Sequence, residues 1–123
     1  MRVAREQKNS ADFAVCYLEE AHPISGWMYG AVTRFIEQHT KLSERRAAAC
    51  TLRSILLEQH GISTGSDMPM VVDLMDNAVS VYYGALPERL VILRDGVVEW
   101  VGGKGPEDYD VEEMRAALAA LLR

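Results

Sequence analysis

The sequence has few cysteines, no long apolar run and no excess of positive charge. Its two cysteines, Cys16 and Cys50, form no Cys-x-x-Cys pair, which excludes a dithiol redox motif of the usual spacing and a zinc ribbon. The longest apolar runs, such as 90–93, are far too short to span a bilayer. A net charge of −5 and the lack of a basic stripe argue against nucleic acid as a partner.

The N-terminal residues 1–8 have no apolar core and therefore do not form a secretion signal. We expect a cytoplasmic protein with no membrane segment. A length of 123 residues with 49% hydrophobic residues is enough to bury a core without disulfides or metal ions. The sequence thus predicts one globular domain over residues 1–123.

The order of the apolar patterns predicts an α/β fold, a sandwich with a mixed sheet flanked by helices. Residues 12–18 are apolar almost throughout, as in a strand that is covered on both faces. Asp95-Gly96 is the favoured two-residue turn of a hairpin. The remaining predicted elements are a helix tail within 2–9, a long connection over 19–40, a helix ending near residue 59, a strand at 69–74, a short helix ending at Gly84, and a helix over 111–122.

The helix ends have recognisable signals. Ser43 or Thr40 is expected to cap the long helix and Gly61 to end it, while Asp110 caps the last helix. Asp76 or Asn77 is expected to cap the short helix, and Ala48, Leu52, Ile55 and Leu56 form the predicted core-facing stripe of the long one. Cys16, within a strand, and Cys50, within a helix, are expected to be small hydrophobic core residues.

The segment 17–27 carries the most reactive side chains of the sequence. It brings Glu20 and His22 directly after a buried strand, at the end where open α/β sheets usually hold their sites. A metal site built from Glu20, His22, His39 and His60 is disfavoured, because their spacing matches no known ligand motif. No nucleophile-elbow motif supports a serine hydrolase either.

Four motifs in series resemble the iodothyronine deiodinases, a branch of the thioredoxin-like fold. The first is Glu-Glu-Ala-His at 19–22, followed by Gly-Trp at 26–27. The other three are Met-Val-Val-Asp-Leu-Met-Asp-Asn at 70–77, Tyr-Gly-Ala at 83–85 with Glu-Arg-Leu at 88–90, and Gly-Gly-Lys-Gly-Pro at 102–106 with Tyr109. The resemblance implies a thioredoxin-like fold, in which Pro87 or Glu88 takes the place of the cis-proline.

The resemblance also implies roles for single residues. His22 matches a histidine that polarises or protonates the substrate, Glu20 matches a residue that supports it, and Glu88 matches a glutamate of the proton-relay network. A histidine near its working pKa beside carboxylates is well suited to proton delivery.

Three further residues are implied to bind substrate. Trp27 matches a residue that supports the site, and His39 matches the histidine that contacts the iodothyronine phenol. Lys104 stands where the animal enzymes carry an arginine that binds the amino-acid end of the substrate, and lysine keeps the charge but loses the bidentate fork.

The activity implied is a thiol- or selenol-dependent reductive dehalogenation of an iodinated or other halogenated aromatic substrate. It needs no bound cofactor, but it needs an external thiol as the reductant. In the family the selenocysteine or cysteine nucleophile follows a strand that precedes residue 13, and this sequence does not contain that strand.

We therefore expect a fold without the first strand of the family and with open edges at strands 13–18 and 89–94. Three explanations of the missing strand stay open. A selenocysteine codon upstream was read as a stop, a homodimer or other partner donates the strand, or the sheet closes in a shorter form. Two other functions stay open. One is a repurposed family member that binds an aromatic ligand or uses His22, Glu20 and Glu88 for acid–base chemistry, and the other is a non-catalytic interaction module.

Overall fold

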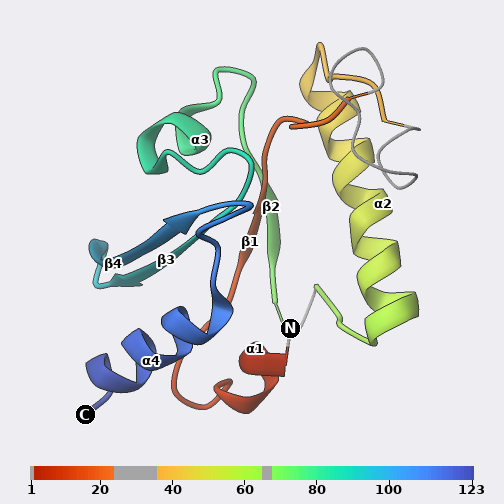
Figure 1. Cartoon of the computed structure of the whole chain (residues 1–123). Helices are drawn as coiled ribbons and strands as arrows, with labels where there is room; N and C mark the ends of the chain where they lie inside the picture. Colours follow the sequence, from red (N-terminus) through yellow and green to blue (C-terminus); the bar gives the residue numbers. More distant parts are fainter. Residues whose placement is uncertain (1, 24–35, 65–67) are drawn as a thin grey trace. The chain divides into compact units, whose positions relative to one another are not determined.

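The computed structural model of the chain describes residues 2–23, 36–64 and 68–123. They form helices together with one parallel and one antiparallel pair of strands, which confirms the mixed α/β class and is consistent with a thioredoxin-like fold (Figure 1). In chain order the elements are α1 (Arg2–Glu6), β1 (Val15–Tyr17), α2 (Leu42–His60), β2 (Met70–Val72), α3 (Ala78–Tyr83), β3 (Arg89–Arg94), β4 (Val97–Lys104) and α4 (Val111–Leu121).

The chain forms two compact units, Met1–Ala78 and Val79–Arg123. In the first unit β1 runs parallel to β2, with Cys16 opposite Val71. The Asp73 amide extends this ladder by donating to the carbonyl oxygen of Tyr17 over 2.9 Å. Helix α2 packs against β2. The prediction of a single domain over the whole chain stays a prediction.

The core of the first unit lies where α2 ends and β2 begins. Leu56, Ile62 and Met68 are its buried centre, and Phe13 and Leu52 are among the half-buried residues packed on it. Removing such side chains from water is the main stabilising contribution to a unit of this size. The predicted stripe of α2 is confirmed at Leu56, which is buried, whereas its other members are half-buried.

The ends of α2 show one confirmed prediction and one wrong one. Gly61 ends the helix in the left-handed conformation, with φ of 61°, and its amide donates to the Leu57 carbonyl oxygen. The N-cap is Lys41, without a side-chain cap, and not Ser43 or Thr40. The Glu44 carboxylate instead accepts from the Thr40 amide over 2.7 Å, which satisfies the backbone just before the helix.

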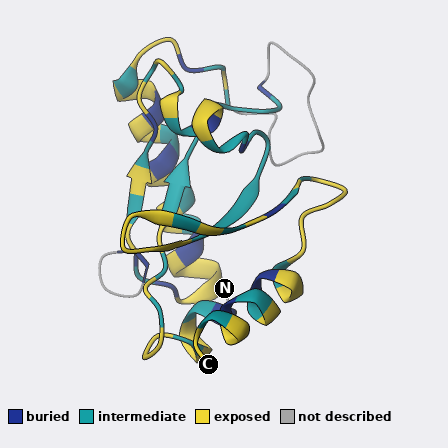
Figure 2. Cartoon of the chain, turned by 90° about the vertical axis from the view of Figure 1, so that its left-hand side faces the viewer, coloured by how far each residue is buried: buried dark blue, intermediate teal, exposed yellow. Residues whose placement is uncertain are grey.

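The second unit contains the predicted hairpin of β3 and β4. Asp95 and Gly96 have φ of 52° and 79°, the left-handed pair that a tight hairpin turn requires. Asp110 caps α4, as predicted, by accepting from the Glu112 and Glu113 amides. Helix α4 packs on both strands through the buried Met114 and Leu118, and much of its remaining surface is exposed (Figure 2).

Two further features of the second half agree with the predictions. Helix α3 begins after Asp76, whose carboxylate accepts from the Ala78 amide over 3.1 Å, and it ends at Gly84. The Leu86–Pro87 peptide bond is cis, at the position where the resemblance placed a cis-proline.

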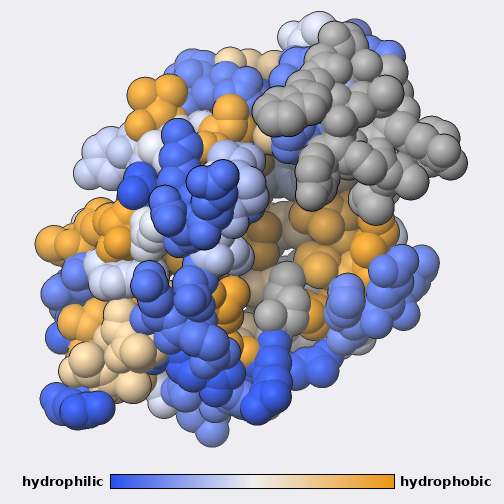
Figure 3. Space-filling view, viewed as in Figure 1, coloured by the Kyte–Doolittle hydropathy of each residue, from blue (hydrophilic) through white to orange (hydrophobic). Residues whose placement is uncertain are grey.

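Apolar side chains of the hairpin reach the surface. Leu93, Val97 and Val101 are 53%, 62% and 42% exposed, and apolar atoms gather on this face of the hairpin in Figure 3. Within the described residues each sheet has two strands, so each has outer strand edges without a ladder partner. The expectation of open edges caused by a missing family strand stays a prediction.

Candidate functional site

The first unit holds a cluster of polar side chains that are buried or half-buried. We define the buried polar cluster as Tyr17, Glu20, Gln38, His39 and Arg45. His39 is 7% exposed and Arg45 only 2%, although arginine is almost never buried without partners. These residues come from β1, from the two described ends of the connection that follows it, and from the first turn of α2.

The side chain of Gln38 holds the backbone of Glu20 in place. The side-chain amide of Gln38 donates to the Glu20 carbonyl oxygen over 2.9 Å, and its oxygen accepts from the Glu20 amide over 3.1 Å. Since a side-chain amide with both groups satisfied acts as a short piece of a β-ladder, Glu20 is fixed although it lies beyond the end of β1. Residues 18 positions apart in the sequence are thereby joined.

The Glu20 carboxylate interacts with two rings. It accepts a hydrogen bond from the Tyr17 hydroxyl, and its Oε1 lies 3.6 Å from Nε2 of His39. The centroids of the Tyr17 and His39 rings are 6.0 Å apart. Burial, followed by the Glu20 hydrogen bond and charge, raises the pKa of Tyr17 well above its usual range, so this phenol stays protonated near neutral pH.

His39 is tied to α2 by Arg45. The Arg45 Nε donates to Nδ1 of His39 over 3.3 Å, while its Nη1 donates to the Asp73 and Leu74 carbonyl oxygens. Burial lowers the pKa of His39, and the charge of Arg45 lowers it further, against the opposing effect of Glu20. His39 is therefore a neutral imidazole near neutral pH.

The sequence motifs indicate Glu20 and His39 as candidate site residues, but not Tyr17, Gln38 or Arg45, which the structure places beside them. One signal was available for Arg45. It lies four residues before Ala49 and eleven before Leu56, on the face of α2 that these two residues bury. A charged residue at a core position of an amphipathic helix indicates a buried partner.

The other predicted site residues of the first unit are less well defined. His22 is half-buried two residues beyond Glu20. Trp27 lies outside the described residues. The predicted roles of both residues stay predictions.

Glu88 and Lys104 belong to the second unit. Lys104 at the end of β4 pairs with Arg89, and the Gly105 amide donates to the Glu88 carbonyl oxygen over 3.0 Å. Glu88 is half-buried and Lys104 is exposed, and their predicted roles stay predictions. Burial, followed by the Glu88 charge, raises the pKa of Tyr109.

Cys16 does not fit the part of an activated nucleophile. Cys16 is half-buried in β1, and burial together with the Asp73 charge raises the pKa of its thiol, which disfavours the reactive thiolate. Cys50 is exposed on α2, so the prediction that it is a core residue is wrong. It lies next to Ala49, which occupies the buried face of the helix in its place.

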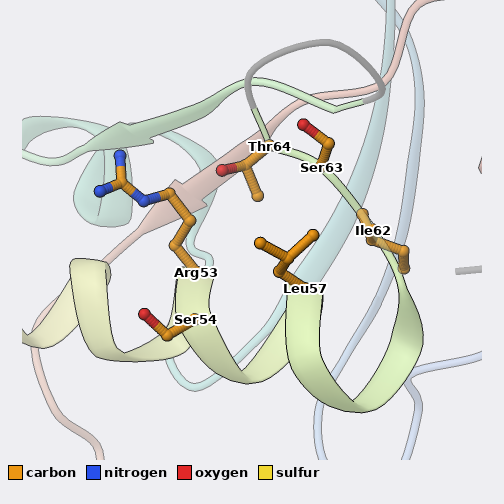
Figure 4. A pocket seen from close by; sticks show the side chains of 6 residues that line it. All are labelled: Arg53, Ser54, Leu57, Ile62, Ser63 and Thr64. Carbon is orange, nitrogen blue, oxygen red and sulfur yellow. The ribbon is translucent and has the colours of Figure 1, made fainter.

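A pocket of about 270 Å³ lies at the C-terminal end of α2 (Figure 4). It is lined by Arg53, Ser54, Leu57, Ile62, Ser63 and Thr64. None of the predicted site residues lines it. Among the described residues no group of histidine, cysteine and carboxylate side chains could hold a metal ion, and no described helix is long and apolar enough to cross a membrane.

Comparison with known proteins gives a consistent result. The family model described as iodothyronine deiodinase matches residues 1–121. A thyroxine 5-deiodinase of Gallus gallus is 38% identical over 117 residues, which cover 95% of this chain and 42% of that protein. The thyroxine 5-deiodinases of Sparus aurata and Homo sapiens are 41% and 36% identical over 93% and 95% of this chain. The chain spans about two fifths of the length of these relatives.

Proposed function

The chain belongs to the iodothyronine deiodinase family, and we propose that it takes part in the reductive deiodination of an iodinated phenol. The observation that carries the proposal is the buried polar cluster, in which a neutral histidine, a carboxylate and a protonated phenol lie together. Such a cluster can bind the phenol oxygen of the substrate and transfer a proton, and the reaction requires both of these steps.

The reaction balances as follows. A thiolate or selenolate attacks the iodine, a sulfur–iodine or selenium–iodine bond forms, and the electron pair of the carbon–iodine bond stays on the aryl carbon. That carbon takes up a proton. An external thiol then attacks the iodinated sulfur or selenium, which releases iodide and leaves a disulfide or selenenyl sulfide. A second external thiol cleaves this bond, which regenerates the thiolate or selenolate and leaves the disulfide of the two external thiols. A compartment rich in reduced thiols, such as the cytoplasm, supplies this reductant.

In this proposal the cluster acts on the phenol ring. Nε2 of His39 faces the oxygen of the iodinated phenol substrate. The hydrogen-bonded pair of Glu20 and Tyr17 lies beside His39 and exchanges a proton with this histidine. Because the His39 side chain is 3% exposed, entry of the phenol must displace the residues that cover it. The roles of His22, Trp27, Glu88 and Lys104 remain those that the resemblance implies.

A second candidate function follows from Cys16. It is half-buried in β1, and burial raises the pKa of its thiol, which favours a repurposed member that binds an aromatic ligand without redox chemistry. The two functions share the binding step and differ in the release of iodide.

The test measures both steps on the same protein. Calorimetry with a diiodinated phenol gives the affinity, and an iodide assay with dithiothreitol gives the turnover. The variant His39→Gln should bind at least tenfold more weakly, which corresponds to about 1.4 kcal/mol. His60→Gln, at an exposed histidine of the same unit, should bind as the wild type does.

The outcomes separate the proposals. Iodide release above the level of dithiothreitol alone supports deiodination, and Cys16→Ser and Cys50→Ser show whether either thiol takes part. Binding without release supports the repurposed function. No binding, or equal binding by His39→Gln and wild type, overturns both.

A further inference from the structure

Arg45 donates three hydrogen bonds to described residues from a position with almost no contact with water. Two bonds from Nη1, of 3.2 and 2.8 Å, attach the guanidinium to the Asp73 and Leu74 carbonyl oxygens just after β2. The third runs from Nε to Nδ1 of His39 over 3.3 Å. The guanidinium plane is thus fixed by the backbone on one side, and it faces the imidazole on the other.

The direction of the third bond determines where the imidazole proton lies. A guanidinium has N–H donors and no acceptor, so Nδ1 of His39 must offer a lone pair. A neutral imidazole has one N–H and one lone pair, which places the proton on Nε2. A doubly protonated ring would bring an Nδ1–H against the Arg45 Nε–H, two donors without an acceptor between them.

Nε2 is the atom of His39 that remains available. It is buried and has no hydrogen-bond partner within the described part of the chain. Oε1 of Glu20 lies 3.6 Å away, beyond hydrogen-bond length, and this carboxylate already accepts from the Tyr17 hydroxyl. A buried N–H without a partner is costly, and the oxygen of a bound molecule can remove that cost.

We propose that Arg45 is a positioning residue that fixes His39 as the neutral Nε2–H tautomer and thereby makes it a hydrogen-bond donor to the phenol oxygen. The ligand in this inference rests on the proposed function. Among the residues that the structure describes, the charged and titratable groups given next to the ring are Arg45 and Glu44 on α2, Glu20, and Tyr17 on β1. Burial and Arg45 favour the neutral ring, whereas Glu20 and Glu44 oppose it.

The first test needs no ligand and no variant. Nitrogen-15 spectra of the imidazole side chains report which ring nitrogen carries the proton. Near neutral pH the His39 resonances should show a protonated Nε2 and an unprotonated Nδ1, with the exposed His60 as the internal reference. A His39 ring protonated on Nδ1, on both nitrogens, or exchanging between tautomers overturns the inference.

Variants then test the part of Arg45. Arg45→Met keeps the length of the side chain and removes the donor, so His39 should lose its single tautomer and titrate at a higher pH. Arg45→Lys keeps the positive charge and an N–H donor, and it should restore the Nε2–H form in part. Arg53→Met makes the same change at an exposed position of α2 and should leave the His39 spectrum unchanged.

A folded Arg45→Met with an unchanged His39 tautomer overturns the inference, and so does an equal change in Arg53→Met. If Arg45→Met does not fold, the His39 tautomer in the wild-type spectrum and in the spectrum of Arg45→Lys tests the inference. The affinity for the diiodinated phenol should fall about tenfold in Arg45→Met. A wild-type Nε2–H tautomer without phenol binding refutes the proposed function alone, so the two failures are distinguishable.

Discussion

Removal of the Tyr17 hydroxyl is expected to destabilise the first unit by an amount that the structure allows us to state. The hydroxyl donates to the Glu20 carboxylate, whose side chain is 12% exposed. A hydrogen bond to a charged group contributes about 1.5–3 kcal/mol, and the partial exposure of Glu20 favours the lower half of that range. Tyr17→Phe should thus lower the free energy of unfolding by about 2 kcal/mol.

Urea unfolding followed by circular dichroism measures this loss. With a typical urea dependence the midpoint should fall by roughly 1 M. A double-mutant cycle of Tyr17→Phe with Glu20→Ala isolates the pair, and its coupling energy should be about 1.5–2 kcal/mol. Tyr82→Phe is the matched control, because Tyr82 is 75% exposed, and it should stay within about 0.5 kcal/mol of the wild type.

The pH dependence of the free energy of unfolding is a second measurement of the bond between Tyr17 and Glu20. The folded-state pKa of Tyr17 lies above its ordinary value of about 10, so its contribution to stability is complete below that pH. The contribution is lost as the pH rises above about 10, and Tyr17→Phe should remove that loss. A coupling energy below about 0.5 kcal/mol would refute the reasoning, since exposed pairs reach that value without burial.

Three other changes have expected outcomes. The pKa of His39 is lowered in the folded state, so its contribution to stability is complete above about pH 6.5 and is lost as the pH falls below it. In thermal melts His39→Gln should therefore lose less stability on acidification than wild type, and an equal loss in the two proteins would contradict this. Gly103→Ala places a Cβ against the backbone of Asp108 and should cost about 1–3 kcal/mol in urea unfolding, and no cost would show that this loop can move freely. Asp110→Ala removes the cap of α4 and should cost about 1 kcal/mol, and an unchanged midpoint would contradict the cap.

Much of the fold could be predicted because local chemistry determines it. The hairpin turn needs two left-handed residues, and Asp95-Gly96 is a sequence that accepts them. Gly61 and Asp110 act at helix ends through their own backbone or side chain, so no distant residue is needed to predict them. The cap of α2 was mispredicted for the opposite reason. The Glu44 carboxylate competes for the Thr40 backbone, and several polar residues in a row allow more than one solution.

The candidate site could be predicted only in part, because its bonds join distant residues. Glu20 and His39 were found through motifs, but the bond that fixes Glu20 comes from Gln38, which no local pattern indicates. Arg45 resembles an ordinary surface residue of a helix until its face is known to be buried. Its carbonyl partners follow β2, nearly thirty residues further along the chain.

We propose that a phenol oxygen binds at Nε2 of His39, and titration of the nitrogen-15-labelled protein with a diiodinated phenol measures this binding directly. Saturable binding should shift the His39 Nε2 resonance, leave the His60 resonances in place, and disappear in His39→Gln. A shift of equal size at His60, or binding that leaves the His39 ring unchanged, would contradict the account.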